Sequence, residues 1–292
     1  MSKRDEFTSD WITAHSEKIC DRYEDGVLTL RGLHYQLVSL GMTNSIRHYK
    51  RVVAAMIKAR REGLIGYHKF SDHDREAIGW TAAAPTSLER QIERGKEQIQ
   101  AWMTAYSRNR WENQERFVEL WIEKKALQGV FESVTRSNDV ALCPCKGYPS
   151  LTFLNEAALR FQRAAERGQI PTMVYFGDHD PSGEDIPRAI GENLRCDFGI
   201  EVDVQVKALH AQQCLDLGLP PAPVKAGDSR SAGFTGLGQI ELDAVRPETL
   251  QEWAQDSIAR NFDQGLHDEL MDDEHNERAE YQAELKEYVS SL

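Results

Sequence analysis

The sequence predicts an α/β protein in which an N-terminal helical domain precedes a mainly parallel sheet flanked by helices. Strand-like apolar runs alternate with helical segments between residues 118 and 206, and this alternation is typical of parallel sheets with right-handed crossovers. Ahead of them, residues 10–62 contain three helical segments, of which the third is strongly basic. That arrangement favours a helix-turn-helix domain. The chain of 292 residues has room for both parts.

The N-terminal helices are indicated by capping residues and by leucine spacing. A first helix is expected over residues 10–23, and Thr29 can cap a second helix in which leucines recur at helical spacing. A third helix is expected over residues 44–62, and the run GLIGYHKF behind it indicates a small wing. Residues 1–80 therefore predict a winged helix-turn-helix domain that binds double-stranded DNA. The side chains expected to contact the DNA phosphates are Arg47, Lys50, Arg51, Lys58 and Arg60.

The predicted sheet has four strands joined by helices. Short apolar runs bounded by turn residues are typical of buried strands, and Gly147 and Pro149 mark one of these turns. Ser150 begins a long amphipathic helix, and Ser182 can cap the helix that follows Pro181. The strands are expected at residues 118–124, 140–143, 173–176 and 201–206.

Carboxylates follow two of these strands. Glu123 ends the first strand, and Asp178 and Asp180 come directly after the third. Residues i and i+2 of an extended segment point to the same face, and open α/β sheets bind ligands at the carboxyl ends of their strands, so the three side chains could converge. Mg²⁺ is typically held by one or two carboxylates with water and phosphate oxygens. The aspartate pair alone would favour a simple acidic turn, and the additional glutamate favours a metal site.

At these residues the chain resembles the Toprim domain of the topoisomerase VI A subunit and its meiotic break-forming relatives. The shared pattern is an apolar strand ending in Glu and Lys, the run GYP, and an apolar strand ending in DxDPxG. The resemblance covers roughly residues 10–260. It implies that Glu123, Asp178 and Asp180 hold Mg²⁺ at a site acting on a nucleic-acid phosphodiester, with Glu123 among the catalytic residues. Lys125 stands where such proteins often carry an acidic residue.

The same resemblance extends to the N-terminal domain. In the A subunit a similar winged-helix domain precedes the Toprim domain and carries the tyrosine that attacks DNA, with an arginine four residues before it. This chain has Arg31 and Tyr35 at that spacing, with His34 in place of the usual aromatic residue. The resemblance implies that Tyr35 is the nucleophile, that Arg31 contacts the phosphate, and that the protein acts as a homodimer. The residues themselves leave the alternative that Tyr35 packs as an ordinary buried side chain.

The net charge of −12 is unusual for a nucleic-acid-binding protein, but binding depends on the local patch more than on the sum. The third helix is basic, and acidic residues gather in the C-terminal segment. We expect a connecting helix over residues 81–112, the metal-binding domain and its extension over 113–262, and an acidic helix or tail over 263–292. Within the extension, Lys225, Ser229 and Arg230 could contact DNA phosphates, and we expect Glu241 and Asp243 to lie on a short terminal strand.

Composition narrows the class of protein. No apolar run approaches the ~18 residues of a membrane span, and the first residues lack the apolar core of a signal peptide. Five cysteines argue against a disulfide framework, so a cytoplasmic protein without membrane contact is expected. The sequence contains no GxxxxGK[ST] phosphate loop. Strand passage of DNA would therefore require a separate ATPase subunit.

The function expected from these observations is Mg²⁺-dependent binding and cleavage of DNA by tyrosine transesterification. Two alternatives remain open. In the first, the protein is a hydrolytic Toprim nuclease in which the three carboxylates activate water through Mg²⁺ and Tyr35 is structural. In the second, it is a non-enzymatic regulator that binds DNA through the winged helix.

Overall fold

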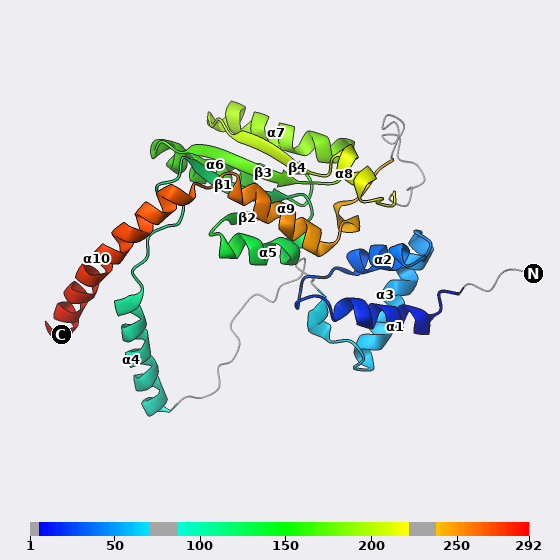
Figure 1. Cartoon of the computed structure of the whole chain (residues 1–292), viewed down its shortest axis with the longest axis horizontal. Coiled ribbons are helices and arrows are strands. Elements are labelled where there is room, and N and C mark those ends of the chain that lie inside the picture. The colour runs from blue at the N-terminus through cyan, green and yellow to red at the C-terminus, as the bar shows by residue number, and fades with distance from the viewer. Residues whose placement is uncertain (1–5, 71–86, 222–237, 292) are drawn as a thin grey trace, which may run out of the picture. The chain divides into compact units, whose positions relative to one another are not determined.

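The computed structural model divides the chain into two compact units (Figure 1). The first unit contains the N-terminal helices and the sheet, and the second contains two long helices. The four-part division expected from the sequence stays a prediction. The first unit comprises residues 1–75 and 117–261, and the second comprises 76–116 and 262–292. The structure describes residues 6–70, 87–221 and 238–291, so Lys225, Ser229 and Arg230 lie outside the described residues.

Three helices form the N-terminal part of the first unit: α1 (Ser9–Cys20), α2 (Leu30–Ser39) and α3 (Ile46–Arg61). Each begins at a hydroxyl cap, because such a side chain satisfies an otherwise unpaired N–H of the first turn. The Thr29 hydroxyl, for example, accepts from the Gly32 N–H at 2.9 Å. The three expected helices are present. Their fully or almost fully buried side chains include Ile12, Ile19, Leu33, Leu37, Val52 and Met56.

The segment expected to form a wing has a different structure where it is described. Residues 63–70 contain a short 3-10 helix, Tyr67–Lys69, and Phe70 makes a single parallel bridge with Leu28. The glycines and aromatic residues of the run GLIGYHKF are thus compatible with a 3-10 turn as well as with the strand pair of a wing. The following residues, 71–86, are not described. Residues 63–70 thus form no strand pair of their own, and the winged-helix assignment of the whole domain stays a prediction.

A four-stranded parallel sheet forms the centre of the first unit, in the order β2-β1-β3-β4. Each strand overlaps one of the four expected apolar runs, with ends that differ by up to three residues. Leu120 pairs with Leu142, and Val174 pairs with Gln205. The expected α/β class and parallel sheet are confirmed. The strands are β1 (Arg116–Ile122), β2 (Ala141–Pro144), β3 (Ile170–Phe176) and β4 (Asp203–Ala208).

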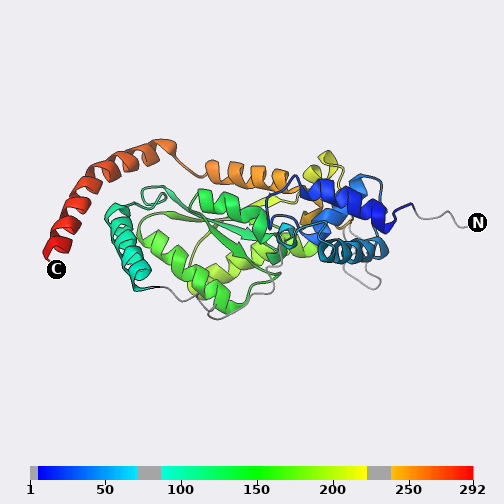
Figure 2. The same ribbon diagram turned by 90° about the horizontal axis from the view of Figure 1, so that it is seen from below.

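Helices cover both faces of this sheet (Figures 1 and 2). On one face, α6 (Leu151–Glu166) and α7 (Pro181–Phe198) pack over a buried cluster that includes Trp121, Met173 and Tyr175. On the other face, Phe131 of α5 lies 5.0 Å from Phe176, measured between ring centroids. Successive strand residues thus enter opposite cores, which explains the continuous apolar runs in the sequence. Helix α5 spans Gln128–Ser137.

Two helices of the first unit were not expected: α8 (Ala211–Asp216) and α9 (Pro247–Ala259). Proline at the first position of α9 suits a helix start, where its missing N–H costs nothing. The helix packs on α5, and the Gln251 amide donates to the Val130 carbonyl at 3.1 Å. No helix was predicted for either of these two segments.

The second unit contains α4 (Leu88–Thr104) and α10 (Gln264–Ser291). The Tyr281 hydroxyl donates to the Trp102 carbonyl at 3.0 Å, and the Glu274 carboxylate accepts from the Arg108 N–H at 2.8 Å. The acidic C-terminal segment is therefore a helix with partners within its own unit. Among the described helices, none combines the length and apolar character needed to cross a membrane.

Candidate active site

Glu123 and Asp178 meet at the carboxyl edge of the sheet, as expected from the strand order. The Glu123 N–H donates to the Phe176 carbonyl at 2.9 Å, which continues the pairing of β1 and β3 beyond the strand ends. The Asp178 N–H in turn donates to Glu123 Oε2 at 2.9 Å. Gly177 permits this approach, because a Cβ there would lie 2.9 Å from the same carboxylate oxygen.

Asp180 follows in the same loop but has another partner. Its Oδ1 accepts from the Gly183 N–H at 2.7 Å and caps α7. The expectation that Ser182 caps this helix is wrong, because Asp180 takes that position and Ser182 lies within the first turn. Gly183 is required here, since a Cβ would lie 2.0 Å from the Asp178 carbonyl oxygen.

Burial disfavours ionisation of the Glu123 and Asp178 carboxylates. Burial, followed by the negative charge of Asp178, raises the pKa of Glu123 to about 7. Burial also raises the pKa of Asp178 to about 6, against the opposing effect of Lys124. Added positive charge at this edge would therefore stabilise both carboxylates in their ionised form.

Lys124 already brings one positive charge to this edge. Its Nζ lies 2.8 Å from Asp178 Oδ2, 3.1 Å from Asp243 Oδ2 and 3.6 Å from Glu241 Oε2. Burial alone would lower the pKa of Lys124, but the three carboxylates together raise it above its ordinary value. The lysine is thus an internal counter-ion, a role that could not be predicted from the sequence.

Glu241 and Asp243 belong to the segment expected to form a short terminal strand, and that expectation is wrong. Ile240 makes a single antiparallel bridge with His179, and residues Leu242–Ala244 form a 3-10 helix. The Leu242 N–H donates to Asp178 Oδ1 at 2.8 Å. These bonds fasten the segment to the loop that carries Asp178.

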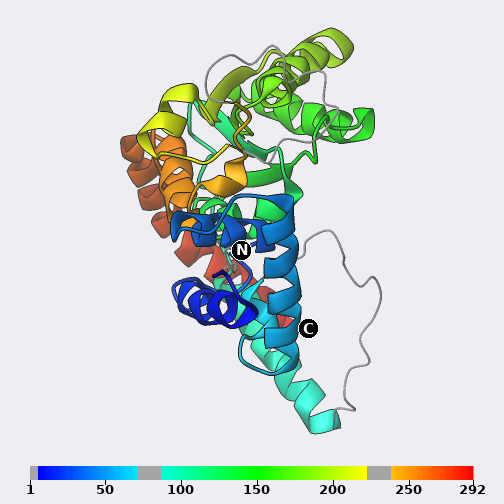
Figure 3. The same cartoon turned by 90° about the vertical axis from the view of Figure 1, so that its right-hand side faces the viewer.

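Helix α2 brings its own functional candidates to the same segment (Figure 3). The Tyr35 hydroxyl donates to Glu241 Oε2 at 3.3 Å, and the Arg31 guanidinium donates to both oxygens of that carboxylate. The Thr29 hydroxyl donates to Asp243 Oδ1 at 3.3 Å. The candidate nucleophile and the sheet edge are therefore connected through Glu241 and Lys124.

Tyr35 is buried, with 4% of its surface exposed. Burial, followed by the charge of Glu241, raises the pKa of its hydroxyl well above the ordinary value. The hydroxyl is therefore a weak nucleophile as it stands. Tyr35 lines a hollow of about 430 Å³ together with Ala244 and Arg246.

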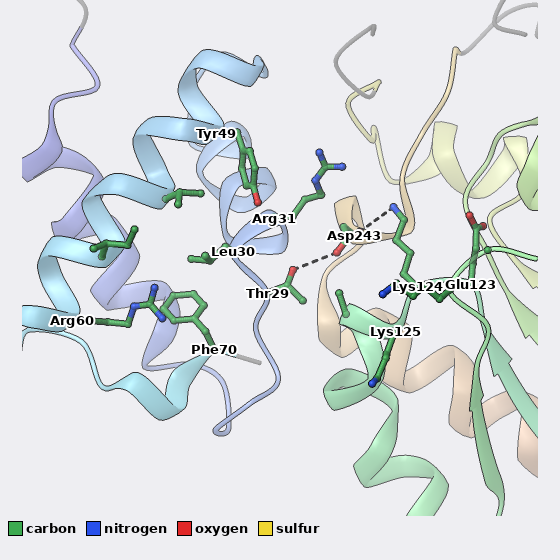
Figure 4. A pocket seen from close by; sticks show the side chains of 15 residues that line it. Thr29, Leu30, Arg31, Tyr49, Arg60, Phe70, Glu123, Lys124, Lys125 and Asp243 are labelled. Atoms are coloured by element: carbon green, nitrogen blue, oxygen red, sulfur yellow. Dashed lines mark hydrogen bonds and ion pairs between the residues drawn. The ribbon is translucent and has the colours of Figure 1, made fainter. Parts of the chain in front are cut away.

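A cleft of about 630 Å³ lies between the N-terminal helices and the sheet edge (Figure 4). Thr29, Tyr49 and Phe70 line it on the helical side. Its charged lining is mostly basic, which suits an anionic ligand. Among the described residues, the charged side chains that line it are Arg31, Arg60, Lys124, Lys125 and Lys146, with Glu123 and Asp243.

The basic residues predicted to contact DNA on α3 divide into two groups. Arg47, Lys50 and Lys58 are exposed, and their spacing places them on one side of the helix. Lys58 also lies 3.9 Å from the Glu62 carboxylate. This side of α3 could follow a phosphate backbone.

Arg51 and Arg60 have partners inside the unit. The Arg51 guanidinium donates to the Phe7 carbonyl. Arg60 lies over the Phe70 ring, 5.4 Å from its centroid, and its Nε donates to the Met56 carbonyl at 3.2 Å. Both side chains contribute to packing, and Arg60 still faces the cleft.

The donor chemistry of the acidic edge suits Mg²⁺, which prefers carboxylate oxygens. The Tyr175 hydroxyl beside Gly177 is buried and has no hydrogen-bond partner among the described residues, and an orphaned hydroxyl next to Glu123 fits a hydrated ion better than a dry core. The described residues nevertheless contain no group of three acidic, His or Cys side chains already arranged as a metal cluster. The oxygen donors at this edge fit Mg²⁺. In the structure, the positive charge beside them is that of the Lys124 ammonium group.

In comparisons with known proteins, no family model, curated protein sequence or solved structure matched this chain. The resemblance to the topoisomerase VI A subunit is therefore one of sequence motifs alone.

Proposed function

We propose that this protein binds double-stranded DNA and cleaves it in a Mg²⁺-dependent transesterification, with Tyr35 as nucleophile, in the manner of the topoisomerase VI A subunit. One observation supports this most directly. The two candidate groups on α2 and the two inner carboxylates of the sheet edge belong to one compact unit and are connected by a short chain of polar contacts. That chain runs from Arg31 and Tyr35 through Glu241 and Lys124 to Asp178 and Glu123.

In the proposed reaction, the Tyr35 oxygen attacks the phosphorus of a DNA phosphodiester and the bond to the 3′ oxygen breaks. The phenol loses its proton, the 3′ oxygen gains one, and the 5′ phosphate remains attached to Tyr35. Arg31 would hold the phosphate oxygens, for which a guanidinium is well suited. Mg²⁺, held by Glu123, Asp178 and Asp180, would neutralise charge on the phosphate.

DNA would bind along the basic surfaces of the first unit. The exposed side of α3 carries Arg47, Lys50 and Lys58, and the cleft carries further lysines and arginines. Such contacts are salt-sensitive and independent of sequence. From the resemblance, we further propose a homodimer, in which two tyrosines could cut both strands, and a separate ATPase subunit if strands are passed.

A hydrolytic nuclease is the second candidate, and the burial of Tyr35 favours it. A side chain that is 4% exposed, with its hydroxyl bound to a carboxylate, has the environment of a structural tyrosine. The acidic edge could then activate water without a covalent intermediate.

A denaturing gel of the protein mixed with Mg²⁺ and supercoiled DNA tests the proposal. DNA that carries covalently attached protein supports transesterification, and cleaved DNA without attached protein supports hydrolysis. DNA that is bound but not cut would contradict both cleavage mechanisms. The protein would then be a DNA-binding regulator.

A further inference from the structure

The Glu241 carboxylate is surrounded by positive and hydrogen-bond-donating groups. Its Oε2 accepts from the Tyr35 hydroxyl at 3.3 Å and from the Arg31 guanidinium, and lies 3.6 Å from Lys124 Nζ. Arg31 also reaches Oε1. The side chain of Glu241 is 16% exposed. Two cations and one hydroxyl thus hold a single anion in a largely buried position.

This set of donors is what a phosphodiester would need. Its two non-bridging oxygens carry one negative charge, as a carboxylate does, and arginine binds either group through the same N–H donors. Exchange of Glu241 for a phosphate would therefore conserve the local charge. The exchange would also place the phosphate beside the Tyr35 oxygen, where a nucleophile has to lie.

The backbone on both sides of Glu241 is fixed. Ile240 and His179 exchange two backbone hydrogen bonds, of 2.8 and 3.1 Å, and the Leu242 N–H is held by Asp178. With the backbone held in this way, the route by which the carboxylate leaves Arg31 and Tyr35 is a change of side-chain rotamer, since each sp³ torsion of glutamate has three staggered conformations.

We propose that Glu241 is an internal substitute for the substrate phosphate. Arg31, Lys124 and the Tyr35 hydroxyl form a phosphodiester-binding site, which Glu241 occupies in the free protein and leaves when DNA binds. The inference rests on the proposed function and adds a built-in competitor to it. The protein without DNA is accordingly held in an inhibited state.

The test compares Glu241→Gln with the parent protein in Mg²⁺-free buffer, where DNA is bound without being cut. The neutral amide is a poorer ligand for Arg31 and Lys124, so a fluorescent double-stranded oligonucleotide should bind about fivefold tighter, and the salt dependence should steepen by about one phosphate contact. Glu248→Gln is the matched control, because it removes one negative charge at an exposed position of α9, where the carboxylate accepts from the Tyr23 hydroxyl and not from Arg31. The control should change affinity much less.

A second substitution locates the effect. Arg31→Gln placed in the Glu241→Gln protein should remove the gain, because the uncovered phosphate contact is lost. A gain that survives without Arg31, or an equal gain in Glu248→Gln, overturns the inference. Unchanged or weaker DNA binding by a folded Glu241→Gln protein also overturns it and makes Glu241 a structural clamp. If that variant does not fold, Glu241→Asp, shorter by one methylene, should show a smaller gain, and no gain overturns the inference.

Inorganic phosphate separates this inference from the proposed function. It should raise the thermal midpoint of Glu241→Gln but hardly that of the parent, whether or not the parent cuts DNA. A parent that cuts DNA while Glu241→Gln gains no affinity for either probe leaves the function standing and refutes the inference. If phosphate raises the thermal midpoint of Glu241→Gln but the parent does not cut DNA, the inference stands and the proposed function is refuted.

Discussion

The ammonium group of Lys124 lies 2.8 Å from the carboxylate of Asp178, at the edge where the sequence predicts a magnesium ion. The same lysine immediately follows Glu123 in the sequence. Two of the predicted metal ligands, Glu123 and Asp178, therefore have a positively charged side chain next to them. Because Glu123 and Asp178 both have raised pKa values, this single charge does not fully compensate the buried carboxylates. A divalent cation would add the missing charge.

Mg²⁺ should therefore stabilise the first unit. We expect the thermal midpoint to rise with Mg²⁺ concentration in the parent, because an ion that binds only the folded state shifts the unfolding equilibrium. Asp178→Asn should lose this response. Asp185→Asn, at a half-buried position on α7 where the carboxylate binds Tyr148 and Arg188, should keep it. A parent protein whose midpoint is indifferent to Mg²⁺ would count against the metal site.

The pKa of Glu123 predicts the sign of a pH effect. The pKa is raised from 4.5 to about 7, so the folded state holds this proton more tightly than the unfolded state does, and stability falls as pH rises from about 4.5 to 7. The Glu123→Gln side chain cannot ionise, so this variant does not lose stability for that reason as the pH rises. Urea unfolding without Mg²⁺ should therefore show the variant gaining stability relative to the parent across that range. A difference independent of pH would argue against the buried, protonated carboxyl.

Gly183 should not tolerate a side chain. Gly183→Ala would bring a Cβ within 2.0 Å of the Asp178 carbonyl oxygen, so the loop must shift, at a cost of about 1–3 kcal/mol. Gly95→Ala on α4 is the matched control, since nothing lies within 4 Å of its added Cβ and alanine favours a helix by about 0.5–1 kcal/mol. Chemical unfolding of both variants checks this, and equal effects would contradict the described loop geometry.

The sequence predicted the sheet well because its strands are buried on both faces. Residues 173–176 are fully enclosed, and such runs of apolar residues with long amphipathic helices between them allow few alternatives. The strand order brought Glu123 and Asp178 together as expected. The helix start at Asp180 was misassigned because a serine and an aspartate two residues apart are both good caps. The signal that favours Asp180 is Pro181, which suits the first position of a helix.

The contacts between the helical part and the sheet edge could not be predicted. Lys124 and Asp243 are 119 residues apart in the sequence, and no periodicity or spacing relates them. A charged residue is assigned to the surface by default, so the near-complete burial of Asp243, at 3% side-chain exposure, had no visible signal. The only local hint was the presence of two carboxylates, Glu241 and Asp243, in an otherwise apolar stretch.

The exposed side of α3 should carry part of the DNA affinity. Arg47→Ala combined with Lys50→Ala should weaken binding to all sequences and reduce the salt slope by about 0.9 for each lost phosphate contact. Arg136→Ala, at an exposed position on α5 with a Glu132 partner, serves as the control for overall charge. Fluorescence anisotropy over a series of salt concentrations measures the slopes. Equal slopes for the parent and the double variant would place the DNA elsewhere.

Covalent trapping with Tyr35→Phe tests the central claim most directly. The substitution removes one hydroxyl and its bond to Glu241, which still has Arg31 and Lys124 as partners, so stability should fall by only about 1 kcal/mol. On a denaturing gel with Mg²⁺ and supercoiled DNA, the parent should yield cleaved DNA with attached protein, and the folded Tyr35→Phe protein should yield neither. If Tyr35→Phe cuts DNA at the parent's rate, Tyr35 is not the nucleophile and the protein is a hydrolytic nuclease.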